Sequence, residues 1–293
     1  MRVAIAGGTG LLGSRLAEAL RQRGDQALVL TRSLPRRPDE VRWDPDTRQA
    51  PDPRVLGELE AIVNLAGAPV GRWWTPAYRT RLRTSRLRAT DLAARIAARC
   101  PGCALINGSA VGYYPLGEDR GLTEADGPGS RFLARLVVDW EAAAAPAKRV
   151  GSRVVFARTG IVLDRSAAST RPLLLLGRLG LGGPLGSGHQ YWPWITLADE
   201  IRALLHLLDN NISGPVNLVG PEPATQGQLA AAIAQRLRRP LGPPAPAAAL
   251  RVALGEFAEE LIGSQRIEPA RLIQTGFEFE QPTLASAVDW LAG

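Results

Sequence analysis

Lysine, cysteine and histidine are almost absent from this sequence of 293 residues. Lys148 is the only lysine, and there are 2 cysteines and 2 histidines. Cys100 and Cys103 cannot build a disulfide framework, and no further Cys or His pair completes a zinc site with them, so we expect no metal. Their Cys-Pro-Gly-Cys spacing falls at the end of an expected helix, whereas a redox-active pair lies at a helix start. We therefore interpret both cysteines as structural.

Long hydrophobic runs are also missing. The most apolar stretch, Arg171–Leu176, is ended at once by Gly177 and Arg178 and is too short to cross a bilayer. The first residues lead directly into a strand-like run, without the apolar core and cleavage site of a signal peptide. These absences predict a cytoplasmic protein with no membrane contact.

The net charge of +7 raises the question of an acidic partner. Because the arginines are spread along the whole chain rather than gathered in one arm, nucleic acid is not a favoured partner. Small ligands that carry phosphate remain compatible. The arginines between residues 79 and 88 wrap around much of an expected helix, which favours a solvated face or a subunit interface. We expect a monomer or a homodimer.

Short apolar runs alternate with helical patterns through the first two-thirds of the chain. The apolar runs are Arg2–Ala6, Ala27–Thr31, Ala61–Leu65, Ala104–Asn107 and Val154–Arg158. The helical patterns are Leu12–Arg23, Pro76–Arg99 and Arg131–Arg149. Strands separated by helices form right-handed βαβ units, so the pattern predicts an α/β fold with a Rossmann-like, doubly wound parallel sheet.

Beyond Gly160 the rhythm changes. Residues 176–193 are rich in glycine and proline and predict a shaped loop. The later elements are expected to be helices at Ile195–Leu208, Gln226–Arg238 and Ala248–Ile262 and a strand at Val216–Leu218. We predict a main domain over residues 1–165, to which residues 195–220 return. Residues 166–194 and 221–293 would form a smaller C-terminal region that covers the substrate.

A glycine-rich loop links the first apolar run to the first helical pattern. Gly7 permits a tight turn, Gly10 lets the backbone approach a pyrophosphate, and Gly13 lets the helix pack closely on the strand. The phosphates would lie against the amides at the helix start. The predicted cofactor contacts in this loop are Gly7, Thr9, Gly10, Leu11, Leu12 and Gly13. A plain turn between strand and helix is the alternative.

The end of the second apolar run favours NADP(H) over NAD. An NAD site usually places a carboxylate there for the ribose hydroxyls, whereas this chain has Arg32 followed by Ser33. A guanidinium offers a planar fork of donors to the 2′-phosphate. We predict that Arg32 and Ser33 contact the cofactor, and we interpret Arg36 and Arg37 as a solvated cluster.

Several further motifs resemble the short-chain dehydrogenase/reductase superfamily in its extended, epimerase-like branch. More narrowly, the chain resembles the atypical family called "epimerase family protein", related to sugar-nucleotide epimerases. Besides the glycine loop, the matching segments are Asn64–Ala68, Thr84–Arg86, Ser109–Tyr114, Trp140–Ala143, Arg158–Leu163, Gly182–Gln190, Trp194–Ile195, Pro269 and Gly276–Phe277.

This resemblance implies a Rossmann-like domain that binds NADP(H), with a small C-terminal region over the nicotinamide end. It implies further cofactor contacts from Leu65, Ala66, Gly67, Ser85, Gly108, Arg158, Thr159 and Gly160. It also implies that the loop from Gly183 to Trp194 closes over the substrate, with His189, Gln190 and Trp194 as the contacting residues. Asp199 would cap a helix or orient this loop.

The Tyr-x-x-x-Lys pair of the superfamily is missing. None of the four tyrosines has Lys or Arg four residues later, and the resemblance puts Leu133 and Val137 at the two positions. Ser109 is retained and could polarise a carbonyl. Tyr113 or Tyr114 could supply a proton, or both could pack the pocket wall, leaving proton delivery to ordered water.

Two hypotheses follow from these residues. The favoured one is an NADP(H)-dependent oxidoreductase or epimerase-like enzyme that acts on a small polar or nucleotide-linked substrate, with Ser109, Tyr113 and Tyr114 as catalytic candidates. The alternative is a non-catalytic NADPH-binding sensor or regulatory protein, which the loss of Tyr-x-x-x-Lys supports.

Overall fold

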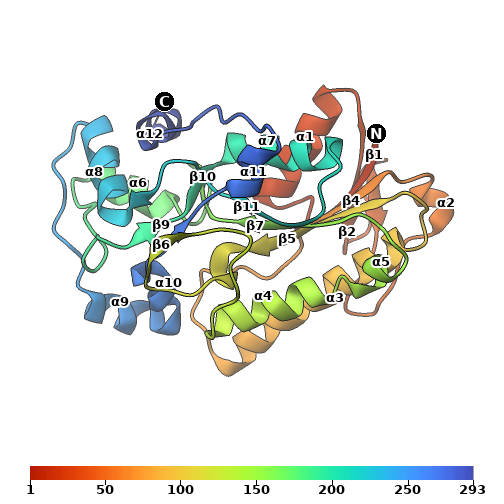
Figure 1. The fold of residues 1–293 in the computed structure, drawn as a ribbon, viewed down its shortest axis with the longest axis horizontal. Helices are drawn as coiled ribbons and strands as arrows, with labels where there is room; N and C mark the ends of the chain where they lie inside the picture. Colours follow the sequence, from red (N-terminus) through yellow and green to blue (C-terminus); the bar gives the residue numbers. More distant parts are fainter. Residues whose placement is uncertain (293) are drawn as a thin grey trace.

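Seven parallel strands form the central sheet of the computed structural model, which describes residues 1–292 (Figure 1). They are β1 (Arg2–Ala6), β2 (Gln26–Thr31), β3 (Glu40–Arg42), β4 (Ala61–Asn64), β5 (Ala104–Ala110), β7 (Val154–Thr159) and β11 (Gly214–Leu218). Their order is β11-β7-β5-β4-β1-β2-β3, and every neighbouring pair is parallel. The strand order reverses direction at β1, which confirms the predicted doubly wound sheet.

Helices cover both faces of this sheet (Figure 1). One face packs against α1 (Leu11–Gln22), α7 (Leu197–Asp209) and α11 (Ala270–Gln274). The other packs against α3 (Pro76–Ala97), α5 (Ala145–Arg149) and α4 (Phe132–Ala142). In β7, Val155 and Ala157 face the first layer while Val154 and Phe156 face the second. Burial of both faces explains why the strands are continuous apolar runs rather than alternating ones.

A smaller group of elements lies beyond one edge of the sheet, at the left of Figure 1. Its helices are α6 (Arg171–Arg178), α8 (Gln226–Arg236), α9 (Ala247–Leu254), α10 (Ala258–Ile262) and α12 (Leu284–Ala292). Three strand pairs join it to the sheet: β8 (Ile161–Leu163) with β10 (Trp194–Thr196), β9 (Tyr191–Trp192) with β12 (Ala224–Thr225), and β6 (Glu118–Leu122) with β13 (Gln265–Ile267). A separate apolar cluster holds this group together. The division into domains at residues 165 and 220 stays a prediction.

Two predicted helices are interrupted. The stretch predicted at Arg131–Arg149 is two helices, α4 and α5, because Pro146 cannot donate to the preceding turn and its ring crowds the carbonyl four residues back. The stretch predicted at Ala248–Ile262 breaks at Gly255, whose φ of 61° ends α9. A 3₁₀ turn, η2 (Gly255–Phe257), then leads into α10.

Other differences concern shorter elements. Ile195 belongs to β10, and α7 begins only at Leu197, because the Thr196 side chain accepts a hydrogen bond from the Asp199 N–H. The predicted loop at 176–193 includes the end of α6. Short pieces without a clear sequence signal were missed, among them α2 (Pro53–Leu56) and η1 (Val111–Tyr113).

Side-chain hydrogen bonds fix several local features. Thr75 caps α3 by accepting from the Tyr78 N–H at 3.1 Å. Asp199 holds the C-terminal segment rather than the predicted loop, since its carboxylate accepts from the N–H groups of Glu280 at 2.8 Å and Gln281 at 3.0 Å. Both cysteines are free thiols, and burial raises the pKa of Cys103 to about 12.

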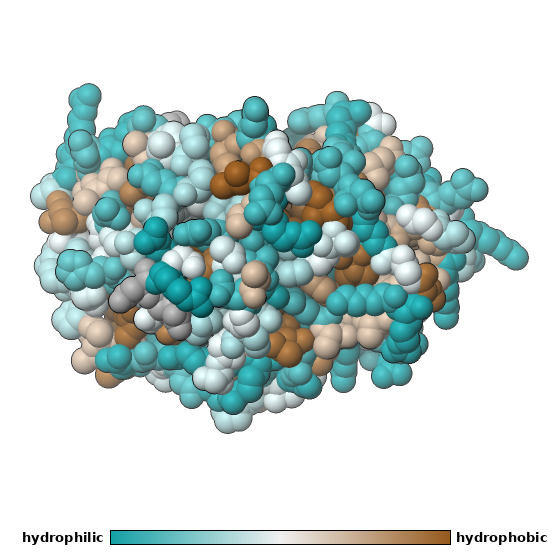
Figure 2. Space-filling model, viewed as in Figure 1, coloured by the Kyte–Doolittle hydropathy of each residue, from teal (hydrophilic) through white to brown (hydrophobic). Residues whose placement is uncertain are grey.

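The face of the molecule seen in Figure 2 is mostly polar. Figure 2 shows teal residues over most of the viewed face, with brown residues in small separate groups. None of the helices within residues 1–292 combines the length and apolar character that a bilayer crossing demands.

The contact between Gly13 and the first turn supplies a test of the fold. A Cβ at Gly13 would overlap the Gly7 carbonyl oxygen and lie 2.7 Å from the Gly8 Cα. We expect Gly13→Ala to lower the free energy of unfolding by about 1–3 kcal/mol, because rigid backbone must move aside. Chemical denaturation measures this. Gly127→Ala is the matched control, since no atom lies within 4 Å of its added Cβ. Equal stability of the two variants would contradict the close packing.

Candidate functional site

The glycine loop forms a cradle between β1 and α1. Gly7 has a φ of 78°, and a Cβ there would lie 2.8 Å from the Leu65 carbonyl carbon, so only glycine fits. At Gly10 the Gly7 oxygen is the only neighbour within 4 Å, so its outer side is open. No side chain caps α1, and its first turn holds no acidic residue. The first N–H groups of the helix are therefore available to an anion, and this cradle fits a dinucleotide pyrophosphate.

The segment after β4 lies beside this cradle and is fixed by a buried polar network. Asn64 donates to Thr90 Oγ1 at 3.0 Å and to Asn107 Oδ1 at 2.7 Å. Thr90 also donates to Asn107 and accepts from the Trp140 indole N–H at 2.9 Å. Asn64 Oδ1 accepts in turn from the Ala66 N–H at 3.3 Å. Because the network is fully buried, it gives the segment one preferred conformation.

Two residues of α3 hold the next part of this segment. Ser85 accepts from the Ala68 N–H at 3.1 Å and donates to the Leu82 carbonyl at 3.2 Å. Arg86 lies against Gly67, where a Cβ would be 3.3 Å from the guanidinium carbon. In space, the predicted cofactor contacts Leu65, Ala66 and Gly67 thus lie next to the glycine loop. Ser85 supports this segment through its bond to Ala68.

Ser109, near the end of β5, hydrogen-bonds to a carboxylate. Its hydroxyl donates to Glu141 Oε1 at 2.7 Å. Arg158 of β7 grips the same carboxylate with two bonds of 2.9 Å, from Nε and Nη2. The strand register explains the meeting, because Ser109 and Arg158 are direct partners in the sheet. The sequence pattern pointed to Glu141 as a family residue but not to its bond with Ser109.

The two tyrosines after Ser109 have different surroundings. Tyr114 is buried, donates to Asn217 Oδ1 at 2.7 Å and accepts from Arg158 at 2.9 Å. Burial raises the pKa of Tyr114 to about 12, although Arg158 and Asn217 favour the phenolate. Tyr113 is half-buried, and the Arg158 guanidinium carbon lies 3.5 Å from its ring centroid.

Arg158 is charged, and each of its three side-chain nitrogens donates one hydrogen bond. Burial lowers the pKa of Arg158, but hydrogen bonds and attraction from Glu141 outweigh this effect, so the pKa is raised overall. Its guanidinium is committed to Glu141 and Tyr114, while the Thr159 hydroxyl points to the opposite face of the sheet and donates to Glu200 at 2.8 Å. Gly160 follows, and a Cβ there would overlap the Pro193 carbonyl oxygen.

Arg32 and Ser33 lie at the other side of the glycine loop, after β2. Both are exposed, and the Ser33 N–H donates to Thr31 Oγ1 at 3.2 Å. Within residues 1–292 Arg32 forms no ion pair, whereas Arg37 lies 3.6 Å from Glu40. Arg32 is thus free to turn toward a phosphate.

The three predicted contact residues of the substrate loop differ in burial, with one exposed and two buried. His189 is exposed. Gln190 is buried and donates to the carbonyls of Leu185 at 2.8 Å and Leu261 at 3.1 Å, which ties the loop to α10. Trp194 is also buried and donates to the Glu222 carbonyl at 3.0 Å.

The carboxyl ends of β1, β4, β5 and β7 bring these groups to one edge of the sheet. Adjacent register pairs are Ala6 with Asn64, Asn64 with Asn107, and Ser109 with Arg158. Ligands of doubly wound sheets bind at this edge, next to the point where the strand order reverses. The strand register therefore brings the predicted contacts from the glycine loop to Ser109 to the same edge of the sheet.

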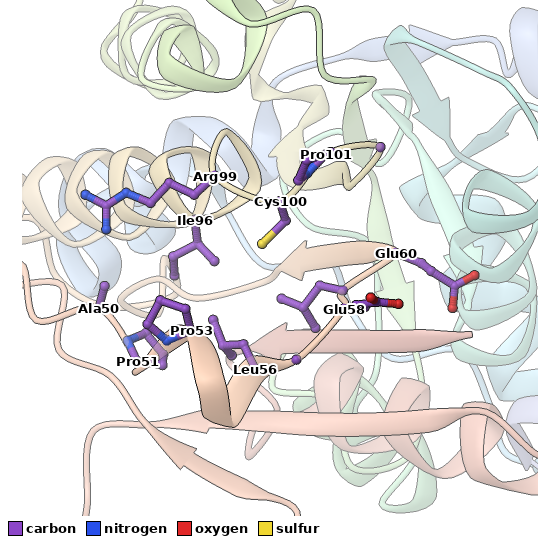
Figure 3. A pocket seen from close by; sticks show the side chains of 13 residues that line it. Ala50, Pro51, Pro53, Leu56, Glu58, Glu60, Ile96, Arg99, Cys100 and Pro101 are labelled. Atoms are coloured by element: carbon purple, nitrogen blue, oxygen red, sulfur yellow. The ribbon is translucent and has the colours of Figure 1, made fainter.

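A cavity of about 620 Å³ lies at the opposite end of the strands (Figure 3). Figure 3 shows Ile96 and Cys100, at the end of α3, directed toward Leu56 and Pro53 of α2. Because this cavity opens at the amino ends of β4 and β5, it is separate from the candidate site.

Comparison with known proteins decides the family. The signature of the NAD dependent epimerase/dehydratase family matches residues 3–220, which include the glycine loop, Ser109 and Arg158. This chain belongs to that family. A domain of unknown function matches residues 245–291. An epimerase family protein of Mycobacterium bovis is 42% identical to this epimerase-family chain over 291 residues, covering 98% of this chain and 96% of the relative.

Solved structures agree with this assignment. Human epimerase family protein SDR39U1, crystallised with NADPH, matches with a TM-score of 0.92 and 33% identity, covering 100% of this chain and 99% of that chain. A nucleoside-diphosphate sugar epimerase from Corynebacterium glutamicum matches with a TM-score of 0.82 and 30% identity, covering 99% of this chain and 58% of that chain. The predicted resemblance to atypical epimerase-like proteins is confirmed.

Glu200 gives the epimerase-family chain a testable pH dependence. It is fully buried with one carboxylate oxygen unpartnered, and burial raises its pKa to about 8 against the bond from Thr159. Between about pH 4.5 and pH 8 the folded chain therefore keeps a proton that the unfolded chain releases, so stability from this group falls as pH rises.

We expect Glu200→Gln, which mimics the protonated acid, to be more stable than wild type by about 1–4 kcal/mol at pH 8. The advantage should shrink toward pH 5. Denaturant unfolding at both pH values measures it, with the exposed Glu58→Gln as control. A variant that is equally destabilised at both pH values would refute the buried, protonated state.

Proposed function

We propose that this chain is an NADP(H)-dependent oxidoreductase or epimerase-like enzyme that acts on a small polar or nucleotide-linked substrate. The observation that carries the proposal is the continuity of the site: an uncapped glycine cradle runs, through the segment after β4, to a serine hydroxyl held by a carboxylate. The NADPH in the human relative supports the cofactor. The cofactor would accept or donate a hydride at the substrate carbon.

The cofactor would extend across the carboxyl edge. Gly7, Gly10 and Gly13 would hold its pyrophosphate, with the N–H groups of Leu11 and Leu12 at the helix start. Thr9 would lie on the exposed outer side of the loop. Arg32, with Ser33, would bind the 2′-phosphate. Beyond the pyrophosphate, Leu65, Ala66 and Gly67 would follow the cofactor toward Gly108, Thr159 and Gly160.

The bond from Ser109 to Glu141 determines what the serine can do. Because the Ser109 hydroxyl donates its hydrogen bond to Glu141, its oxygen can only accept a hydrogen bond from a ligand. This geometry suits a substrate hydroxyl that donates to Ser109 Oγ. On oxidation, that proton would pass to Ser109 while the serine proton passes to Glu141 Oε1, and reduction would run the same steps backward. Because Arg158 stabilises the ionised form of Glu141, it would favour the reductive direction, in which Glu141 gives up its proton.

Such a relay would replace the missing Tyr-x-x-x-Lys pair. Leu133 and Val137, at the two aligned positions, cannot move protons because neither side chain has a titratable group. Leu133 packs near Gly112, and Val137 is buried. Lys148 does not substitute for them, because its ammonium lies 4.5 Å from the Phe156 ring centroid on the outer layer. Of the two tyrosines, we assign a substrate-facing role to the half-buried Tyr113.

The remaining assignments follow from burial. Tyr114 would position Arg158 rather than exchange a proton, because its hydroxyl is saturated. Of the three predicted substrate contacts His189 is the exposed one, so we propose it as the direct contact, with Gln190 and Trp194 shaping the loop around it. We further propose a cytoplasmic location and a monomer or homodimer.

A non-catalytic NADPH sensor is the second candidate. The observation that favours it is the commitment of Arg158 and Tyr114 to each other and to Glu141 and Asn217, which leaves few free polar groups for chemistry. A sensor would bind the cofactor and change a contact with a partner, without hydride transfer.

Cofactor selection is tested first. We expect Arg32→Ala to raise the NADPH dissociation constant about 10- to 100-fold, because a charge-assisted fork to the 2′-phosphate is lost. The NADH constant should change by less than about 3-fold. Isothermal titration calorimetry with both cofactors measures this, with Arg36→Ala as the matched exposed control. Binding of neither cofactor by wild type would refute enzyme and sensor together.

The serine relay is tested by turnover. In a screen of small alcohols, carbonyls and nucleotide-linked sugars, followed by NADPH absorbance for net redox turnover and by chromatography of the products for epimerisation, we expect Ser109→Ala to lower turnover at least about 100-fold. Its NADPH dissociation constant should match wild type, because the hydroxyl acts on the substrate. Wild-type NADPH binding without turnover on any compound would instead favour the sensor.

A further inference from the structure

Arg86 is the one arginine of α3 that is buried, and it has no acidic partner within residues 1–292. It is 8% exposed and makes a single hydrogen bond, from Nη1 to the Leu82 carbonyl at 3.2 Å. Exposed arginines of the same helix do have partners: Arg83 lies 2.9 Å from Asp139, and Arg88 lies 2.9 Å from Asp46. The arginine of α3 without an acidic partner is thus the buried one, where an unpaired charge lowers the stability of the fold most.

Rigid neighbours hold the guanidinium in place. On one side lies Gly67, where an added Cβ would meet Arg86 Cγ and Cζ at 3.3 Å and Nη1 at 3.4 Å. On the other side lies Trp140, with its ring centroid 5.0 Å from Arg86 Cζ. Trp140 is itself fixed by its bond to the buried Thr90. The fork is therefore pre-oriented, and its position depends on residue 67 being glycine.

This location is next to the predicted path of the ligand. Gly67 follows Leu65 and Ala66, which touch the glycine cradle at Gly7. Burial lowers the pKa of Arg86 to about 10, with attraction from Tyr78 opposing, so it remains a cation at neutral pH. A desolvated cation with four N–H bonds unused attracts an anion more strongly than an exposed one.

We propose that Arg86 binds a phosphate group of the ligand beside Gly67, and that it is left unpaired for that purpose. The inference rests on the proposed function, in which both candidate ligands carry phosphate: the dinucleotide and a nucleotide-linked substrate. A fixed guanidinium beside Gly67 would contribute two parallel bonds to phosphate oxygens. The apo chain is thereby less stable than it would be with a neutral side chain.

The test compares R86Q, R86K and wild type, with R81Q as control, because Arg81 is exposed on the same helix. Melting temperatures are measured for each apo protein. Calorimetry then measures NADPH binding, and UDP binding to the NADPH-loaded protein. UDP stands in for the phosphates of a nucleotide-linked substrate.

We expect apo R86Q to melt at or above the wild-type temperature, because an unpaired buried charge is removed. A rise of about tenfold or more in the NADPH dissociation constant assigns the phosphate to the cofactor. An unchanged NADPH constant with a similar loss of UDP affinity assigns it to the substrate. R86K should recover part of either affinity, and R81Q should behave as wild type.

Other results overturn the proposal. If R86Q melts below wild type and binds NADPH and UDP with unchanged constants, Arg86 serves packing alone. If R86Q does not fold, R86M, which keeps the aliphatic packing without the charge, takes its place, and wild-type affinities for NADPH and UDP in R86M lead to the same conclusion. Absence of NADPH binding by wild type refutes the proposed function, while the UDP titration on the apo protein still tests Arg86. Binding of neither ligand refutes both.

Discussion

The ion pair between Arg158 and Glu141 is the interaction on which the site depends. It joins β7 to α4, positions the Ser109 hydroxyl and orients Tyr114. Tyr114 continues the chain of contacts to Asn217 of β11. Because Arg158 is buried and the pair is bidentate, removing Glu141 would leave an uncompensated buried charge next to Ser109. One contact therefore links three strands and a helix at the carboxyl edge.

Two buried arginines at this edge have opposite situations. Arg158 donates from all three side-chain nitrogens to Glu141 and Tyr114 and belongs to the framework. Arg86 lies against Gly67 and Trp140, and among the described residues the Leu82 carbonyl is the one acceptor of its hydrogen bonds. The same side chain thus serves as a structural connector in one place and, in our proposal, as a ligand receptor in the other. In that proposal, the unpaired charge of Arg86 lowers the stability of the ligand-free chain and is compensated when a phosphate binds.

The central sheet could be predicted because its strands are buried on both faces and its glycine loop has strict backbone requirements. The shorter elements could not, since β6, β9, β12 and β13 have two to five residues and depend on partners distant in the chain. The predicted helix 131–149 is divided because Pro146 lies in the first turn of α5, although the apolar pattern continues through this point. In the same way, Gly255 ends α9 within a stretch whose apolar pattern continues.

The glycine loop, the carboxyl-edge motifs and the absence of a Tyr-x-x-x-Lys pair can be read directly from the sequence, because they depend on residue identity at short spacing. Which polar groups already have hydrogen-bond partners depends on the tertiary fold. The bond from Ser109 to Glu141 spans 32 residues, and that from Tyr114 to Asn217 spans 103. Hydrogen-bond partners at such separations are set by strand register and helix packing, which no local pattern encodes.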